Sequence, residues 1–510
     1  MTASLRRKFQ RFRLQENSAR FANIVCILAA GAAFSATGYA QDQTCKIVPT
    51  RQEFWIRLTD PVSTYSSKRG DPIRAMLIAP PECDGSPVLP MGAVAEGHVT
   101  YVRKVGYGIW HDSSAITILF DKIVVNSVPL EVRTRVEEIA NGREDVKAGV
   151  IGGIGGRKTP QQILSTRLLH LPFWNAEDYW VYLLRRGVFP FSPEPEIYLP
   201  PGTDLRLQLT APLEVPDELR DAGEQRSTRK DAELDSDLRE KLLSLPRRTV
   251  TGSGKASDVV NLAFIGSPQQ IEMAFQAAGW TYGDKVSARS VLREMRAMSS
   301  LSSYTHLPIS RQWLAGKSPD VRLQKSFDSY QKREHIRLWN EDTVEKDLWV
   351  GSVIRETSAS WSIRTGRFIH HVDPDLRAER EKVVRDLVLT GCVDKIADLQ
   401  RQETWQEVKN ASGDELRSDG EVAVIEFNDC AATDLASVVP SQTLPWRPKS
   451  KLQRFIRAQA LSLHDIWRSN VIYVSFDLSR AVFRAVKQRR TVKYETHVNS
   501  LPAPEPKDSN

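Results

Sequence analysis

The stretch RFIHHVDPDLRAER, from Arg367 to Arg380, places two histidines and two aspartates within six residues. Imidazole and carboxylate groups at this density could bind a metal ion or act as an acid–base pair. On a strand, residues two apart share a face, so His371 and Asp373 would form the ligand pair while His370 points the other way. Metal binding is one of three interpretations of this segment.

The second interpretation is a helix start. Asp373 precedes Pro374, and an aspartate N-cap followed by proline at the first helical position is a common way to begin a helix. Asp375 would add a second carboxylate at the positive end of the helix dipole. This reading needs no ligand and predicts a long helix over DPDLRAEREKVVRDLVLTG, which ends at Gly391.

The third interpretation is a polar face on the preceding sheet. His335, Arg337 and Trp339 alternate with apolar residues, so they share one side of their strand, and Arg355 and His370 could join them from neighbouring strands. Arginines beside histidines suit a phosphate or carboxylate ligand. A buried salt-bridge network would use the same residues for structure alone. The acids available to such a network are Asp373, Asp375 and Glu379.

The N-terminal sequence predicts the cellular compartment in which these residues lie. A basic N-terminal segment is followed by the apolar run IVCILAAGAAF and then by the small residues Gly38 and Ala40. This pattern is typical of a secretory signal peptide that is cleaved after Ala40. The apolar run is shorter than the roughly 20 residues that span a bilayer. We therefore expect a periplasmic or secreted protein without a transmembrane helix after cleavage, by either the general or the twin-arginine export route.

Removal of residues 1–40 changes the charge of the chain. The whole chain is formally +7, but this segment holds six basic residues and one acid, so the mature protein is near +2. Nucleic-acid binding requires basic residues concentrated on one face, and the charge gives no support for it. We expect envelope proteins or the membrane surface as partners.

Four cysteines remain after cleavage, an even number in an oxidising compartment. We expect two disulfides, Cys45–Cys83 and Cys392–Cys430. Zinc is the rival interpretation, but the sequence has no C-x-x-C pair.

Residues 45–216 predict a β-rich barrel or sandwich, because short alternating apolar runs are separated by Gly, Pro and Asp turns. Four segments of this part resemble the barrel of TrbI-type conjugation proteins. They are GDPIRAMLIAP, LPMGAVAEGHV, LFDKI and LPPGTDLRLQLTAPL. That resemblance implies a scaffold or anchor that performs no chemistry. An aromatic segment, LLHLPFWNAEDYWVYLLRRGVFPF, is either domain core or an exposed docking patch.

Two glycine-rich stretches invite a nucleotide-binding interpretation. GVIGGIGGRKT and GSGKAS both lack the G-x-x-x-x-G-K-[ST] pattern of a phosphate-binding loop. We expect mobile or close-packed glycine loops there and no cofactor.

Residues 217–241 read as a charged linker whose end, with leucines every four residues, forms an amphipathic helix. Residues 242–440 predict an α+β domain with helices on one face of an antiparallel sheet. VVNLAFIG, EHIRLWN, LWVGSVIRET, RFIHHV and EVAVIEFN are its expected strands. Ser267 and Pro268 should begin a helix that ends before Gly279.

Six segments, in this order along the chain, resemble the LssY C-terminal domain family over about residues 242–430. They are DVVNLAFIGS, AAGW, LPISRQWLAGKSPDVRLQK, REHIRLW, LWVGSVIRE and HHVDPDLRAER. The family occurs in bacterial envelope proteins and brings no established catalytic residue. Glu356 stands where the family pattern has an aspartate. The matching positions are His335, Arg337, Trp339, Trp349, Gly351, Arg355, His370, Asp373, Asp375, Glu379 and Arg380.

Residues 441–510 predict a helix–strand–helix extension with a disordered tail, and the basic run SRAVFRAVKQRRTVKY is either a solvated helix or a lipid-binding one.

The sequence as a whole predicts an exported envelope protein that acts by binding or assembly. The alternative is a hydrolase of phosphate-bearing envelope lipid or glycan that uses His370, Asp373 and Arg337. No G-x-S-x-G or H-E-x-x-H motif supports it.

Overall fold

The structure is a computed structural model, and residues from Lys46 onward form one compact unit. The predicted signal peptide, Cys45, most of the aromatic segment, the middle of the charged linker and most of the C-terminal extension lie outside the described residues. The structure describes residues 47–83, 86–105, 113–154, 193–219, 234–284, 287–302, 304, 306–326, 332–341, 347–362, 367–401, 407–430, 444–457, 479, 482, 483, 485 and 486.

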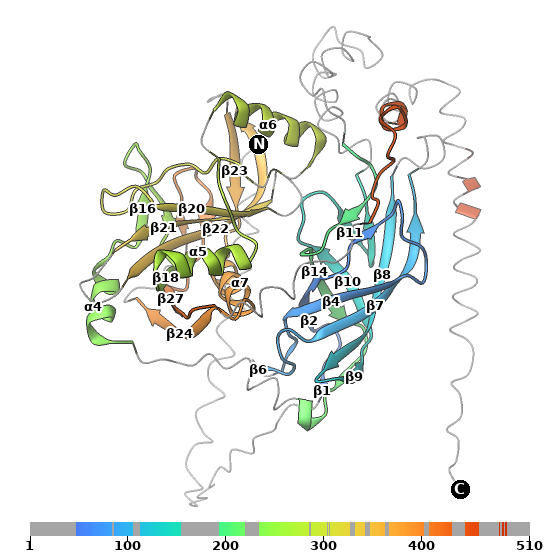
Figure 1. Cartoon of the computed structure of the whole chain (residues 1–510), viewed down its shortest axis with the longest axis horizontal. Coiled ribbons are helices and arrows are strands. Elements are labelled where there is room, and N and C mark those ends of the chain that lie inside the picture. The colour runs from blue at the N-terminus through green and yellow to red at the C-terminus, as the bar shows by residue number, and fades with distance from the viewer. Residues whose placement is uncertain are drawn as a thin grey trace, which may run out of the picture. The chain divides into compact units, whose positions relative to one another are not determined.

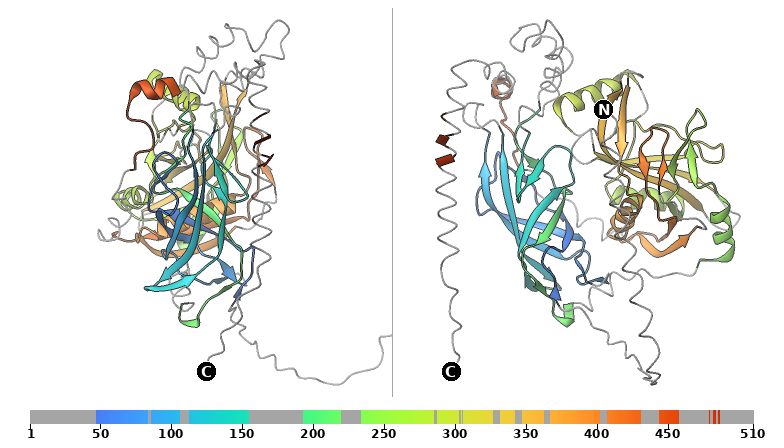
Figure 2. Two further views of the ribbon diagram at one scale, coloured as in Figure 1. Left: turned by 90° about the vertical axis from the view of Figure 1, so that its right-hand side faces the viewer. Right: turned by 180° about the vertical axis from the view of Figure 1, so that it is seen from behind.

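The β-rich part is a nine-stranded antiparallel sheet that curls into a nearly closed barrel (Figure 1). Strand β10 pairs with β14 at one end of the sheet and also contacts β11 and β12 at the other. Figure 2 shows this curled sheet from two further sides. Its strands are β2 (Glu53–Leu58), β4 (Pro72–Ala79), β7 (Val94–Arg103), β8 (Ala115–Val125), β9 (Val128–Glu131), β10 (Thr134–Ile139), β11 (Asp145–Lys147), β12 (Val150–Gly152) and β14 (Asp204–Leu209).

The alternation of side chains explains how these strands close around a core. In β8, Ile116, Ile118 and Phe120 are buried while the residues between them are half-buried. Residues two apart share a face, so one side of each strand lines the interior. Three short antiparallel pairs flank the sheet: β1 (Ile47–Val48) with β15 (Leu213–Glu214), β3 (Val62–Ser63) with β13 (Tyr198–Leu199), and β5 (Glu82–Cys83) with β6 (Ser86–Pro87).

The second part is built on an eight-stranded sheet in the order β19-β20-β21-β22-β18-β27-β24, with β23 paired to the far end of β22. All its pairs are antiparallel except that of β18 with β27. The strands are β18 (Leu262–Ile265), β19 (Thr281–Tyr282), β20 (Val321–Ser326), β21 (Arg333–Asn340), β22 (Leu348–Ser362), β23 (Arg367–Val372), β24 (Val393–Gln400) and β27 (Glu421–Phe427).

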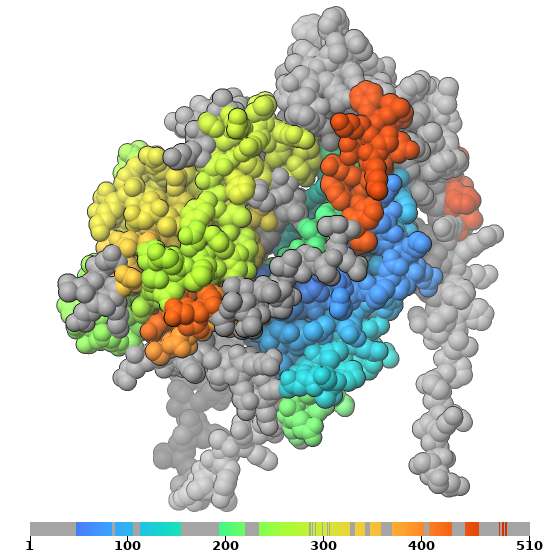
Figure 3. Space-filling view, viewed as in Figure 1, coloured from blue at the N-terminus to red at the C-terminus, as the bar shows by residue number. Residues whose placement is uncertain are grey.

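Helices cover both faces of this sheet, whereas the sequence predicted one face. Helices α5 (Pro268–Ala277) and α7 (Leu376–Val388) pack on one face around Phe264 and Ile336. Helix α4 (Ser236–Ser244) packs on the other through Leu238 and Leu242, as its leucine spacing predicted. Helix α6 (Ala288–Ser300) lies at the surface (Figure 3).

Several local predictions are confirmed. Ser267 caps α5 in a capping box, and Gly279 follows its end at φ +84°. VVNLAFIG differs from its prediction as one strand: it divides between β17 (Ala256–Val259) and β18, because Asn261 between them bonds the backbone of Val353. The two remaining small hairpins are formed by β16 (Arg248–Val250) with β17, and by β25 (Val408–Lys409) with β26 (Glu415–Leu416).

The structure also tests the predictions for the cysteines and the glycine-rich loops. Cys392 and Cys430 form the expected disulfide, and Cys83 is disulfide-bonded as well, although its expected partner is not among the described residues. GSGKAS makes the turn between β16 and β17, with Gly254 at φ +75°. In the other glycine stretch, Val150–Gly152 forms β12 and Gly153 packs against Ser114.

Candidate functional site

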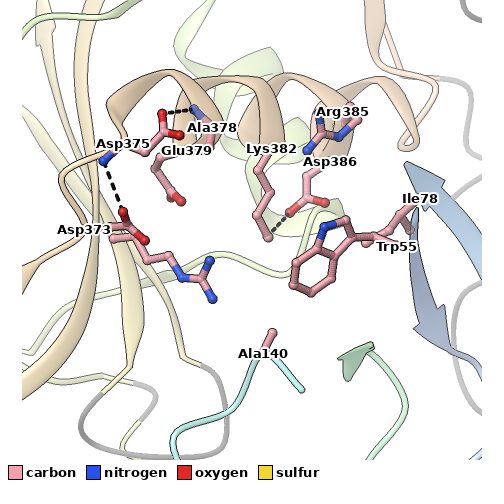
Figure 4. A pocket seen from close by; sticks show the side chains of 11 residues that line it. Trp55, Ile78, Ala140, Asp373, Asp375, Ala378, Glu379, Lys382, Arg385 and Asp386 are labelled. Carbon is pink, nitrogen blue, oxygen red and sulfur yellow. Dashed lines mark hydrogen bonds and ion pairs between the residues drawn. The ribbon is translucent and has the colours of Figure 1, made fainter. Parts of the chain in front are cut away.

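A cavity of about 100 Å³ lies beside the first turns of α7. Figure 4 shows the helix along one wall, with Glu379 and Lys382 directed into the space and Asp373 at one end. Three residues of the β-rich part complete the lining. The full set is Trp55, Ile78, Ala140, Arg355, Asp373, Asp375, Ala378, Glu379, Lys382, Arg385 and Asp386.

The start of α7 differs from the prediction. The N-cap is Asp375, whose Oδ1 accepts a hydrogen bond from the Ala378 backbone N–H at 2.9 Å. Asp373, predicted as the cap, accepts from the Asp375 N–H at 3.1 Å. The turn at Pro374 therefore precedes the helix, and the first helical residue is Leu376. The aspartate two residues later caps because its side chain reaches the third N–H of the helix.

Glu379 is the most unusual group in the cavity wall. Its side chain is 3% exposed, and its Oε1 has no hydrogen-bond partner among the described residues. Burial and then the nearby Glu334 carboxylate raise the pKa of Glu379 well above its usual value. Its carboxyl group keeps its proton well into the pH range where an exposed glutamate has lost it. A protonated carboxyl group can donate a hydrogen bond or a proton to a ligand.

The next turns of α7 join a buried network of charges. Lys382 Nζ lies 3.0 Å from Glu334 Oε1 and 3.1 Å from Asp386 Oδ2. Lys325 Nζ lies 2.7 Å from the same Asp386 oxygen. Burial alone would raise the pKa of Asp386, but Arg57, Lys325 and Lys382 hold that pKa well below its usual value.

Arg57 of β2 connects this network to the β-rich part. Its guanidinium binds Asp204 of β14 through two bonds, Nε–Oδ1 at 2.6 Å and Nη2–Oδ2 at 2.9 Å. The same Nη2 lies 2.9 Å from Asp386 Oδ1. Residues 329 positions apart in the chain thus share one buried ion pair. Arginine suits this place because its planar fork satisfies two carboxylates at once.

Arg355 lies on the same side of the sheet as α7. It stands opposite Glu334 in the register of β21 and β22, and it lines the cavity. Burial alone would lower the pKa of Arg355, but Glu334 and Glu379 hold it above its usual value. The cavity therefore combines an acid whose pKa is raised, cations and carboxylates.

The opposite side of β21 and β22 carries a second buried cluster, centred on Glu356. Arg333 binds this carboxylate through two bonds of 2.6 and 2.9 Å. The Nδ1 atoms of His335 and His370 lie 3.2 and 3.0 Å from its two oxygens, without the alignment of hydrogen bonds. Burial would raise the pKa of Glu356, but Arg333 and His370 hold it well below the usual value.

His335 is held neutral in this cluster. Burial, followed by the charges of Arg337 and Arg333, lowers the pKa of His335 to about 4. A neutral imidazole beside a carboxylate that Arg333 already binds is typical of a structural network.

The remaining predicted residues have structural partners elsewhere. Arg337 Nη1 binds Asp258 at 2.7 Å, and its other nitrogens bind Ser310. Trp339 is buried and donates from Nε1 to the Lys317 carbonyl at 3.1 Å. Arg380 binds Asp419 through two bonds, and also Glu421.

The sequence-predicted set thus divides between the two sides of the sheet. The structure brings Arg355, Asp373, Asp375 and Glu379 together in the cavity wall, and places His335, Arg337, Trp339 and His370 on the other side. His370, Asp373 and Arg337, the machinery of the hydrolase alternative, do not converge. His371 contacts Asp414 at 2.8 Å and does not pair with Asp373. Within the described part of the chain, no three His, Cys, Asp or Glu side chains are grouped as a metal ion requires.

Three charged residues of the cavity-side network were missed: Lys382, Asp386 and Arg57. Lys382 and Asp386 follow Glu379 by three and seven positions, the spacing of one helix face, and this signal was present in the sequence. Arg57 had no such signal, because its partners Asp204 and Asp386 are far away in the chain.

Comparison with family models finds a match in the second part of the chain. Residues 242–422 match the family model LssY C-terminus. This LssY-like part contains α7, β21 and β22, and hence the Glu356 cluster and the α7 side of the charged network. Arg57 and Asp204 of that network lie outside the match. Trp55, Ile78 and Ala140 of the cavity wall lie outside the match. The resemblance of the β-rich part to TrbI-type barrels stays a prediction. Comparison with curated proteins gives no match.

Proposed function

We propose that this protein is exported to the cell envelope and acts there by binding and assembly, with the LssY-like part joined to the β-rich part as a scaffold. One observation carries the proposal: most of the predicted polar set forms hydrogen bonds with neighbouring groups, and His335 and His370 lie within ion-pair distance of Glu356. The hydrogen-bonded members are Arg337, Trp339, Asp373, Asp375 and Arg380. Groups held in buried ion pairs and caps stabilise one arrangement of the chain and are unavailable for chemistry.

The export step rests on the N-terminal sequence. A disulfide at Cys392–Cys430 is consistent with an oxidising compartment. No helix among the described residues has the length and apolar character needed to cross a bilayer. Cell fractionation and intact mass should give a periplasmic chain that starts at Gln41. Thiol labelling without denaturant should find no free cysteine. A cytoplasmic chain, or labelled Cys392, would contradict the export step.

The binding step can be separated from catalysis with two variants. A deletion strain is complemented with Arg57→Met, which breaks the buried junction, or with Glu379→Gln, which removes the acid but keeps its shape. A scaffold should lose complementation and envelope cross-links in Arg57→Met and keep both in Glu379→Gln. Complementation lost in a stable Glu379→Gln protein would favour an enzyme instead.

Glu379 is also the observation that favours the second candidate, hydrolysis of a phosphate ester. In that reaction, water oxygen bonds to phosphorus, the bond to the leaving oxygen breaks, and Glu379 gives its proton to that oxygen. A proton of the attacking water then returns to the Glu379 carboxylate. Arg355 and Lys382 would stabilise the phosphoryl charge. Assays with phosphomonoester and phosphodiester substrates test this reaction. Turnover that Glu379→Gln abolishes supports it, and turnover equal in both proteins excludes this role for Glu379.

A further inference from the structure

The α7 cavity contains a buried acid that is not fully satisfied. Glu379 is 3% exposed, its Oε1 has no hydrogen-bond partner among the described residues, and Figure 4 shows its side chain directed into the space. Burial, followed by the charge of Glu334, raises the pKa of Glu379, so this group keeps its proton to a higher pH than an exposed glutamate. In the protonated form it can donate a hydrogen bond. A ligand that accepts this bond relieves the cost of leaving a buried polar group unpaired.

The other charges in the cavity wall balance one another. The wall contains the cations Arg355, Lys382 and Arg385 and, besides Glu379, the carboxylates Asp373, Asp375 and Asp386. An anion that enters the cavity meets Asp373 and Asp386, and a cation meets Arg355 and Lys382. Because each like-charge contact is unfavourable and neither sign is in excess, the wall favours a neutral ligand.

Apolar side chains and the size of the cavity restrict the ligand further. Trp55, Ile78 and Ala140 give the wall an apolar part, and ligand pockets commonly combine such surface with a few polar groups. The volume of about 100 Å³ is that of roughly three water molecules, which admits one edge of a ring compound. Asp375 and Ala378 are exposed, so the remainder of a ligand can extend into solvent at that end.

From this wall we infer that the α7 cavity binds a neutral saccharide unit, with Glu379 donating a hydrogen bond to a sugar oxygen. A hydroxyl group both donates and accepts, so neighbouring hydroxyls of one sugar can accept from Glu379 and donate to Asp373. The apolar C–H surface of the sugar ring packs on Trp55. The inference rests on the binding function proposed above and names its ligand class. It differs from the phosphate-ester alternative, in which Glu379 transfers its proton.

The test measures binding of sugars to the purified full chain by calorimetry. The probes are the neutral methyl glycosides of glucose, galactose, mannose and N-acetylglucosamine, and methyl glucuronide is the anionic comparison. At least one neutral glycoside should bind, and methyl glucuronide should bind no better. Glu379→Leu should weaken binding at least about tenfold, because it removes the donor. Glu240→Leu, at an exposed position of α4, is the matched control and should bind like the wild type.

Three results of this measurement overturn the inference. They are the absence of binding by every neutral glycoside, tighter binding of methyl glucuronide, and unchanged affinity in Glu379→Leu. Ala378→Phe serves if Glu379→Leu does not fold. Ala378 is exposed and lines the cavity, so a ring there fills the entrance without removing a buried charge. Glycoside binding should be lost in this variant, and unchanged binding again overturns the inference.

Glu379→Gln separates a hydrogen-bond donor from a catalytic acid. Its amide keeps the shape and an N–H donor, so the variant should bind the glycoside like the wild type. Wild-type binding should weaken as pH rises from about 5 to about 9, because Glu379 loses the proton that it donates, whereas binding by Glu379→Gln should stay constant. Loss of binding in Glu379→Gln contradicts the donor role.

The same variant controls for the charged groups that face Glu379. These are Glu334, Arg355, Lys382 and Asp386. All four remain in Glu379→Gln, so an equal pH dependence in both proteins would come from them and would overturn the inference. Calorimetry decides the ligand class, whereas export and complementation decide the proposed function, so either can fail alone.

Discussion

The two sides of the β21–β22 pair carry buried charges of the same kinds but in different states. On one side, Glu356 is bound by Arg333 and approached by two histidines, and its pKa is held low. On the other, Glu379 has an oxygen without a partner beside a cavity, and its pKa is raised. Sequence composition does not separate the two clusters. The state of the central carboxylate does: Arg333 binds both oxygens of Glu356, whereas Glu379 lies beside a cavity with Oε1 unpaired among the described residues.

The largest effect is expected where the cavity-side network joins the β-rich part. Arg57→Met leaves the Asp204 and Asp386 carboxylates buried with fewer cations, so we expect a loss of about 3–5 kcal/mol in the free energy of unfolding. Urea denaturation measures it. Arg74→Met breaks an exposed pair with Asp60 and should cost at most about 1 kcal/mol. Equal costs for the two variants would mean that the junction adds no stability.

The Glu356 cluster should make the free energy of unfolding depend on pH. His335 has a pKa of about 4 in the folded protein and a higher, ordinary value when unfolded. Between these values the unfolded state alone binds the proton, so stability falls as pH falls from about 6.5 to 4, by roughly 3 kcal/mol in total. His335→Gln should lose this part of the slope. Denaturation at a series of pH values measures it, and identical slopes in both proteins would rule out a neutral His335.

The start of α7 gives a smaller effect. Asp375→Ala removes the cap and should cost about 0.5–2 kcal/mol, whereas Asp375→Asn should be nearly silent. Asp373→Ala should cost less than Asp375→Ala, because it removes only a bond to the turn. Thermal unfolding compares the three variants. A larger cost at Asp373 would restore the cap predicted from sequence.

The smallest effect should be at Glu379, and its sign depends on pH. Because the folded pKa is raised, ionisation of Glu379 works against folding as pH rises above about 4.5. Glu379→Gln should therefore match the wild type near pH 4.5 and become more stable by about 1 kcal/mol or more at pH 8. Glu240→Gln, at an exposed position of α4, is the control. A variant less stable than the wild type at pH 8 would show that the carboxylate is paired.

Much of the fold was readable from local patterns. Alternation in β8, the capping box of α5 and the leucine spacing of α4 each act within a few residues, so the sequence contains them whole. The candidate site was predictable only in part. The sequence selected Arg355 and Glu379 but could not place them opposite Arg337 and His335, because the side of a sheet that a helix covers depends on the whole fold. The role of Arg57 could not be predicted, because it depends on contacts between segments that are distant in the sequence.

The parallel pairing of β18 with β27 determines the order in which the LssY-like part can be completed. Leu262 pairs with Ala423, so a strand near the start of the part needs its last strand as a neighbour. Such distant pairing is slow, and until it forms β18 remains an unprotected edge. A chain shortened before Glu421 would keep the apolar strand but lose its cover. We expect such a fragment to aggregate, so domain boundaries for expression should extend beyond Phe427, and beyond Cys430 to retain the disulfide.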